Sequence, residues 1–299
     1  MFNFDLNKLD TLALELNSFW NLQCGYCPRI TYNFPVKKEF MKDNFIDFII
    51  DNLINNSSLE WIELNGYNQI IYGKDDIDKL NMIIKKIKEK SNKDIKFKVC
   101  TNGSSVKNTN FYDILNLNID IMYFTKHNKE DFWIEDLVCF FKENNTSYTR
   151  YIHKENINKE IIIFNNKIYV FMADSSNLTE ENKSEWKQLI NKNKYSNVGY
   201  YIINVGNKCK YLDKSSITNN KDNCLMNYPM IDYRGYVLPC FARHSLFKDN
   251  LEYGHLEEKD GKVIYIKNDN IDWNWCTDCQ NDPDCNPGIN LDNYVKIEF

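Results

Sequence analysis

The sequence predicts an α/β fold built on a parallel sheet, followed by a smaller cysteine-rich segment. Strand-like and helix-like patterns alternate over residues 11–152, and five or six such βα units follow one another. Cysteines at characteristic spacing after residue 223 set the last quarter of the chain apart. The alternation predicts parallel strands, but it does not decide whether the sheet is doubly wound or curled into a barrel.

The expected elements follow the two hydrophobic periods. Strands are short runs of apolar or alternating residues, expected at 11–17, 60–64, 95–100, 119–124, 148–152 and 198–205, with one or two more within 160–173. Helices have apolar residues three and four apart, expected at 38–54, 75–90, 111–117, 130–143 and 179–191. In the second of these helices, four apolar residues face inward and the lysines face outward.

Length and composition narrow the class of protein. The chain has 299 residues, of which 43% are hydrophobic, and a net charge of -5. It shows no basic stripe, so we expect no nucleic-acid partner. We see no targeting segment and no apolar run long enough for a membrane, so we expect a cytoplasmic protein without a membrane partner. We expect an α/β core over 1–206, a polar linker over 207–223, and a cysteine-rich module over 224–299.

The cysteine spacing indicates a metal site near the end of the chain. Ten cysteines in a chain without a secretory signal favour metal binding or redox chemistry over disulfides. Cys276 and Cys279 form a tight pair, and Cys224 and Cys240, which flank an expected hairpin at 230–238, supply two further thiolates. Four thiolates suit either zinc or an iron–sulfur cluster, and the spacing does not decide between the two metals.

The C-terminal pattern resembles the SPASM/Twitch module of radical S-adenosylmethionine (SAM) proteins. The resemblance rests on Cys224, on Gly235 followed by Cys240, on the spacing Cys276-x2-Cys279-x5-Cys285, and on Gly254-His255-Leu256. Residue 289, where the full pattern has a cysteine, is isoleucine, which implies a shortened version with one cluster. The resemblance implies one [4Fe-4S] cluster held by Cys224, Cys240, Cys276 and Cys279, with Cys285 as an alternative ligand.

The first part of the chain resembles the radical SAM core. The matching residues are Asn21-Leu22, then Cys24-Gly25-Tyr26-Cys27, and Thr101-Asn102-Gly103 after the third expected strand. The resemblance implies a partial (β/α)6 barrel, with the C-terminal metal-binding module as a small second part. It also implies SAM contacts from Gly66, Gln69, Thr101 and Asn102.

Two residues depart from the radical SAM pattern. Trp20 stands where the Cys-x3-Cys-x2-Cys motif has its first cysteine, so only Cys24 and Cys27 remain to hold a second [4Fe-4S] cluster. An indole cannot ligate iron, because its nitrogen is a donor only. Gln69 stands where the family has a glutamate that accepts a hydrogen bond from SAM. Cys100 is a candidate third ligand, or alternatively a small buried residue, and Cys139 is expected in the core.

Two functions fit these observations. The first is an enzyme that modifies a peptide or a small sugar- or nucleotide-like substrate through a 5′-deoxyadenosyl radical. The second is a non-catalytic descendant that keeps the fold and the auxiliary cluster and acts as a binding or partner protein. Trp20 and Gln69 are the residues that discriminate between them, and the sequence assigns no catalytic residue.

Overall fold

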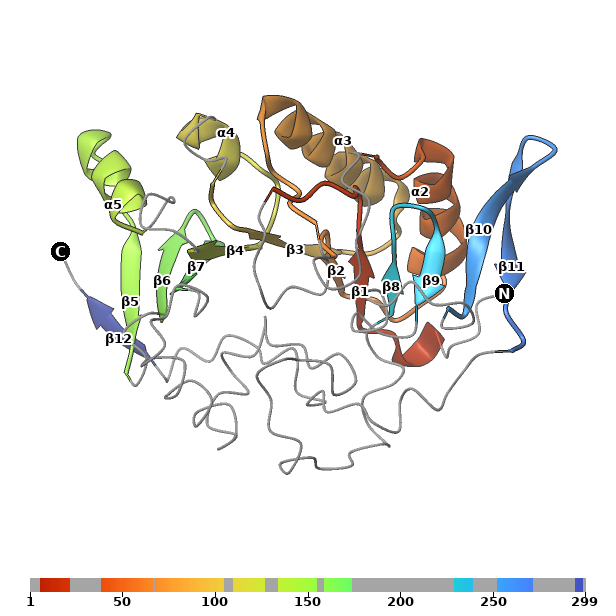
Figure 1. The fold of residues 1–299 in the computed structure, drawn as a ribbon. Coiled ribbons are helices and arrows are strands. Elements are labelled where there is room, and N and C mark those ends of the chain that lie inside the picture. Colours follow the sequence, from red (N-terminus) through yellow and green to blue (C-terminus); the bar gives the residue numbers. More distant parts are fainter. Residues whose placement is uncertain are drawn as a thin grey trace, which may run out of the picture.

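A computed structural model describes nine segments of the chain. These are residues 6–21, 39–66, 68–104, 110–126, 134–154, 159–173, 229–238, 252–270 and 294–297. Within them, the strands form one sheet in the order β11-β10-β9-β8-β1-β2-β3-β4-β7-β6-β5-β12. Helices α2, α3, α4 and α5 lie along one face of this sheet (Figure 1). The sheet is open, because its end strands β11 and β12 do not pair with each other.

The centre of the sheet is parallel, as the sequence predicts. Its strands are β8 (Met230–Ile231), β1 (Thr11–Leu14), β2 (Trp61–Glu63), β3 (Lys96–Thr101), β4 (Ile121–Lys126) and β7 (Lys167–Ala173). The helices are α2 (Asp43–Ile49), which continues as the π-helical turn η2 (Ile50–Ile54), α3 (Lys74–Lys90), α4 (Phe111–Leu115) and α5 (Ile134–Glu143), with a short η1 (Leu6–Lys8) before β1. The first four βα units are therefore confirmed.

After α5 the prediction of a continuing parallel series is wrong. Strands β5 (Thr149–His153), β6 (Lys159–Phe164) and β7 form an antiparallel meander, and β7 returns to pair with β4. The turn between β6 and β7 is Asn165-Asn166, with φ of 48° and 62°. Two consecutive residues in the left-handed region form the tight hairpin turn that asparagine tolerates well. The apolar run at 160–173 is thus two strands.

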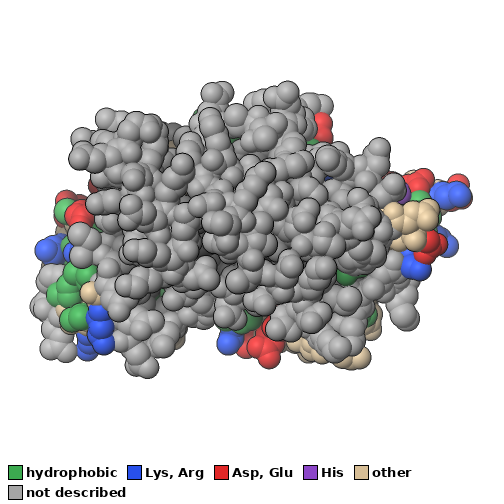
Figure 2. Space-filling view, turned by 60° about the horizontal axis from the view of Figure 1, so that its bottom comes forward, with side chains coloured by type: hydrophobic (Ala, Val, Ile, Leu, Met, Phe, Trp, Pro, Cys, Tyr) green, Lys and Arg blue, Asp and Glu red, His purple; other side chains and the backbone are tan. Residues whose placement is uncertain are grey.

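The strands after residue 229 extend the same sheet at both of its ends. At one end β8 pairs in parallel with β1, and β9 (Tyr236–Leu238), β10 (Gly254–Lys259) and β11 (Lys262–Lys267) follow in antiparallel order. At the other end β12 (Tyr294–Ile297) pairs with β5. In Figure 2 the described side chains at the right-hand end, where Figure 1 places β10 and β11, include acidic and basic ones. Charges on an edge strand oppose further strand pairing.

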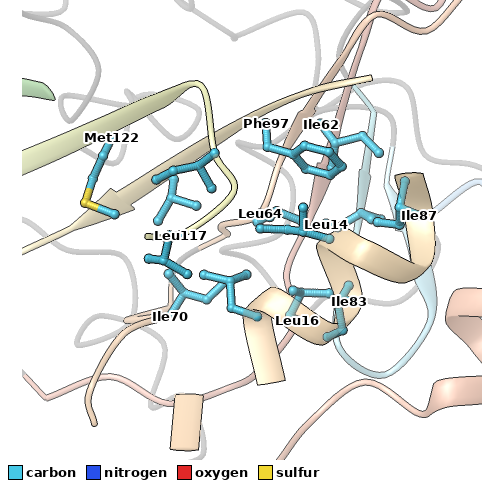
Figure 3. Packing of buried hydrophobic residues seen from close by; sticks show 14 of the residues in the cluster. Leu14, Leu16, Ile62, Leu64, Ile70, Ile83, Ile87, Phe97, Leu117 and Met122 are labelled. Atoms are coloured by element: carbon cyan, nitrogen blue, oxygen red, sulfur yellow. The ribbon is translucent and has the colours of Figure 1, made fainter. Parts of the chain in front are cut away.

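The hydrophobic core lies between the sheet and the helices. Alternate residues of β1, β2 and β3 meet the inner stripe of α3, as Figure 3 shows for Leu14, Ile62, Phe97, Ile83 and Ile87. Each of these side chains is at most 2% exposed, and burial of one such side chain contributes about 1.5–3 kcal/mol. None of the helices within the described segments is long and apolar enough to cross a membrane.

Cys139 is not part of this core, and the prediction that it is buried is wrong. Helix α5 buries Ile134, Leu137, Val138 and Phe141, which recur at helical spacing. Cys139 is the residue after Val138, so its side chain points away from the buried stripe of the helix. The Cys139 side chain is exposed.

Candidate functional site

The segments that follow β1, β2 and β3 meet at the carboxyl edge of the parallel strands. Asn68 Nδ2 donates to Asn17 Oδ1 (3.2 Å), Gln69 Nε2 donates to Thr101 Oγ1 (2.6 Å), and Asn102 Nδ2 donates to Asn21 Oδ1 (2.8 Å). These three bonds join each segment to another. The described residues of the three segments therefore share one edge of the sheet, as expected for loops that follow neighbouring parallel strands.

Asn65 lies in the segment after β2, and its side chain extends the pairing of β2 with β3. Its Nδ2 donates to the carbonyl of Cys100 (2.8 Å), and its Oδ1 accepts from the Cys100 backbone N–H. The side chain thus supplies the donor and acceptor that a further β-ladder residue would supply. As a result the end of β2 is fixed against the end of β3.

Glycine is required at position 66 because neighbouring side chains approach its backbone closely. A Cβ at this position would lie 2.2 Å from Met230 Cε and 2.7 Å from Glu15 Oε1. Both of those residues are fully buried. Packing of β1 and β8 against the turn therefore already accounts for a glycine at position 66.

Gln69 is buried, at 1% exposure, and it connects β2 to β3. Its Nε2 donates to the carbonyl of Ile71 (2.5 Å) as well as to Thr101 Oγ1, and its Oε1 accepts from the backbone N–H of Asn102 (3.1 Å). Its own backbone N–H donates to the carbonyl of Phe19 (2.7 Å), in the segment after β1. The residue therefore touches all three segments.

Asn102, Asn21 and Ser104 form a closed ring of side-chain hydrogen bonds. Asn102 Nδ2 donates to Asn21 Oδ1, Asn21 Nδ2 donates to Ser104 Oγ (2.6 Å), and Ser104 Oγ donates to Asn102 Oδ1 (2.6 Å). The backbone N–H of Ser104 also donates to Asn102 Oδ1 (3.0 Å). Rings in which each group both donates and accepts polarise and strengthen their bonds.

Two buried polar atoms near this edge have no hydrogen-bond partner among the described residues: Trp20 Nε1 and Thr125 Oγ1. Trp20 directly precedes Asn21 of the ring. Thr125 follows Phe124, which pairs with Thr101, so the strand register places Thr125 beside Asn102. A buried donor or hydroxyl without a partner costs about 1–3 kcal/mol, which a polar ligand would recover.

The face of the sheet opposite the helices carries a second, partly charged cluster. Cys100 is buried there beside Ile121 and Tyr123, and its Sγ donates to Glu63 Oε1 (3.7 Å). Lys98 Nζ lies 4.9 Å from the centre of the Trp61 ring. Burial lowers the pKa of Lys98, and the nearby carboxylate of Glu63 partly opposes this. The expectation of a small buried residue at position 100 is confirmed, and its role as a third iron ligand stays a prediction.

The predicted metal ligands lie outside the described residues. These are Cys24, Cys27, Cys224, Cys240, Cys276, Cys279 and Cys285. Within the described part of the chain, no group of three or more His, Cys, Asp and Glu side chains could hold a metal ion. The auxiliary cluster of the cysteine-rich module therefore stays a prediction, and so does the incomplete site of Cys24 and Cys27.

The sequence pointed to Gly66, Gln69, Thr101 and Asn102, and the structure brings all four to one edge. It adds polar residues that sequence reasoning missed: Asn17, Asn68, Ser104 and Thr125. Their shared signal is a polar residue placed at, or just after, the end of an apolar strand. That signal becomes informative only when the strands are known to be parallel neighbours.

Several solved structures align with most of the chain at low sequence identity. BtrN in complex with AdoMet and 2-DOIA aligns with a TM-score of 0.47 and 14% identity, over 83% of this chain and 78% of that one. Native anSMEcpe with bound AdoMet and Cp18Cys peptide aligns with a TM-score of 0.43 and 14% identity, over 82% and 76%. Streptococcus suis SuiB bound to precursor peptide SuiA gives 0.28 and 12%, over 82% and 62%. No protein-family model and no curated protein matches the sequence.

Proposed function

We propose that this chain is a radical-SAM-like iron–sulfur protein that binds SAM at the carboxyl edge of its parallel strands. Its substrate class is a peptide or a small sugar- or nucleotide-like molecule. The observation that carries the proposal is the hydrogen bond from Asn102 to Asn21. It joins the segment leading to Cys24 and Cys27 to the Thr101-Asn102-Gly103 segment, the two parts of the sequence that resemble the radical SAM core.

The described residues fit an organic ligand such as SAM. The edge presents amide and hydroxyl groups. Two of its buried polar atoms, Trp20 Nε1 and Thr125 Oγ1, have no hydrogen-bond partner among the described residues. SAM offers hydroxyl, amino, carboxylate and purine groups that can meet them. When bound to a reduced cluster in enzymes of this kind, SAM supplies a 5′-deoxyadenosyl radical.

The N-terminal motif does not fit a cluster held by three thiolates. Its first position is Trp20, whose nitrogen cannot ligate a metal. Cys100 would have to leave its hydrogen bond with Glu63 to replace that ligand. We therefore derive no reaction step through such a cluster. The auxiliary cluster of the cysteine-rich module is the iron site that the proposal includes.

Equilibrium dialysis with SAM tests the proposal directly. Anaerobically reconstituted protein should bind SAM, and substitution of Thr125 by valine, which keeps the shape and removes the hydroxyl, should weaken binding. Thr149→Val, in β5, is a control of the same chemical kind. Absence of SAM binding by the wild-type protein would refute the proposal.

Incubation with SAM and a strong reductant then separates the two functions. Release of 5′-deoxyadenosine that depends on Cys24 and Cys27 would identify an enzyme. SAM binding without release would identify the non-catalytic descendant, and Trp20→Cys should then raise the iron content, because it restores the missing thiolate.

A further inference from the structure

Backbone groups determine the orientation of the Gln69 carboxamide. A carbonyl can only accept and a backbone N–H can only donate. The Ile71 carbonyl therefore fixes the position of Nε2, and the Asn102 N–H fixes the position of Oε1. Both N–H donors of the carboxamide are used, the second by Thr101 Oγ1.

The Asn102 that Gln69 holds is also a member of the ring with Asn21 and Ser104. Gln69 binds the backbone of Asn102, while the side chain of Asn102 binds Asn21. The orientation of this ring is determined as well, because the Ser104 backbone N–H can only donate to Asn102 Oδ1. A continuous path of hydrogen bonds thus runs from the β2 segment through the β3 segment to the start of the Cys24 and Cys27 segment.

We propose that Gln69 is a positioning residue that must be an amide, because its two N–H donors hold the Ile71 carbonyl and the Thr101 hydroxyl while its Oε1 holds the backbone of Asn102. The side chain of Asn102 in turn holds Asn21, in the segment after β1. Its function is to fix the edge that receives the ligand. This inference goes beyond the proposed function, and only its SAM readout rests on it.

The proposal predicts an unusual response to the substitution Gln69→Glu. Glutamate would restore the acidic residue that the radical SAM pattern has at this position. In this protein, however, a carboxylate would remove both donors and place a buried negative charge against the Ile71 carbonyl. We therefore expect the apparently restoring change to damage the site.

The damage should depend on pH in one direction. Burial beside a carbonyl raises the folded-state pKa of the introduced carboxyl above its unfolded value of about 4.3. The protonated form regains one donor, so the loss of stability is smallest below that unfolded value and grows as the pH rises through the folded-state pKa. The melting temperature of Gln69→Glu should thus fall further below that of wild type at pH 8 than at pH 5.

Hydrogen exchange measured with the full chain tests whether Gln69 acts through Asn102. At pH 8, Gln69→Glu should speed exchange in residues 17–21 and 101–104 and leave α3 unchanged. The matched control is Asn118→Asp, which adds the same charge at an exposed site where Lys88 Nζ donates to the side chain (2.9 Å). Gln69→Met should speed exchange in the same two segments without the pH dependence. This variant replaces Gln69→Glu in the exchange experiment if Gln69→Glu does not fold.

SAM affinity provides a readout that a purely structural role would not move. It should fall about tenfold in Gln69→Glu at pH 8, the loss expected for about one displaced hydrogen bond, and recover toward the control at pH 5. Exchange in the two segments that matches the control would overturn the proposal, and so would tighter SAM binding by the glutamate variant. If wild type does not bind SAM, the proposed function fails, and the exchange data alone decide the role of Gln69.

Discussion

Gly66→Ala separates packing from ligand binding at a position where the sequence suggested a SAM contact. The new methyl carbon would lie 2.2 Å from Met230 Cε, 2.7 Å from Glu15 Oε1 and 2.8 Å from Glu15 Cβ. The Met230 methyl group can move at low cost because it ends a flexible side chain. Glu15 Cβ is fixed to the backbone beyond the end of β1, so relief there requires a shift of the main chain.

The size of the effect follows from two opposing contributions. Overpacking of an interior costs roughly 1–3 kcal/mol, whereas alanine reduces the entropy of the unfolded chain and returns about 0.4–1 kcal/mol. We expect a net loss of about 1–2 kcal/mol. For a chain of this length that corresponds to a melting temperature lower by about 2–3 °C.

Thermal unfolding of the protein without ligand, followed by circular dichroism, measures this change. Gly73→Ala is the control, since a Cβ there meets nothing within 4 Å. Its small cost at the helix N-cap and its entropic gain should cancel to within about 0.5 kcal/mol. If Gly66→Ala melts like wild type but binds SAM more weakly, the glycine serves the ligand and the packing argument is refuted.

Three further predictions concern two buried side chains and the predicted metal site. Tyr169→Phe should raise the melting temperature by about 1–2 °C, because the buried hydroxyl has no partner among the described residues; a lower value would show that it is bonded. Trp20→Phe should leave thermal stability unchanged or slightly higher yet weaken SAM binding about tenfold in dialysis, and unchanged affinity would exclude its N–H from the site. Replacing Cys276 and Cys279 together by alanine should remove iron and sulfide from the reconstituted protein in elemental analysis, whereas loss of zinc without sulfide would identify the other metal.

The sequence predicts the fold best where structure is local. Helix α3 is predicted to within one residue, because the inward stripe of Leu80, Ile83, Ile84 and Ile87 is a property of adjacent turns. The β5–β6–β7 meander was missed as an antiparallel unit. Its signal is Asn165-Asn166, and two asparagines without a glycine are a weaker hairpin signal than Asn-Gly.

The candidate site is less accessible to sequence reasoning because its bonds are non-local. Gln69 and Thr101 are 32 residues apart in sequence, and Asn21 and Asn102 are 81 apart. A sequence motif gives the residue type at position 69, but it does not reveal that the Ile71 carbonyl, the Thr101 hydroxyl and the Asn102 backbone N–H occupy its side-chain amide. Likewise, the reason for glycine at position 66 depends on Met230, which comes from the far end of the chain.

The pairing of β8 with β1 has a consequence for the synthesis of this protein. Ala13 leaves the ribosome more than two hundred residues before its strand partner Met230 is made. Until then one edge of β1 has no strand beside it, and unpaired edges recruit other chains. Contacts between residues so distant in sequence also close slowly. We therefore expect nascent chains that stop before residue 229 to aggregate or to require a chaperone, even though they contain the four βα units that the structure describes.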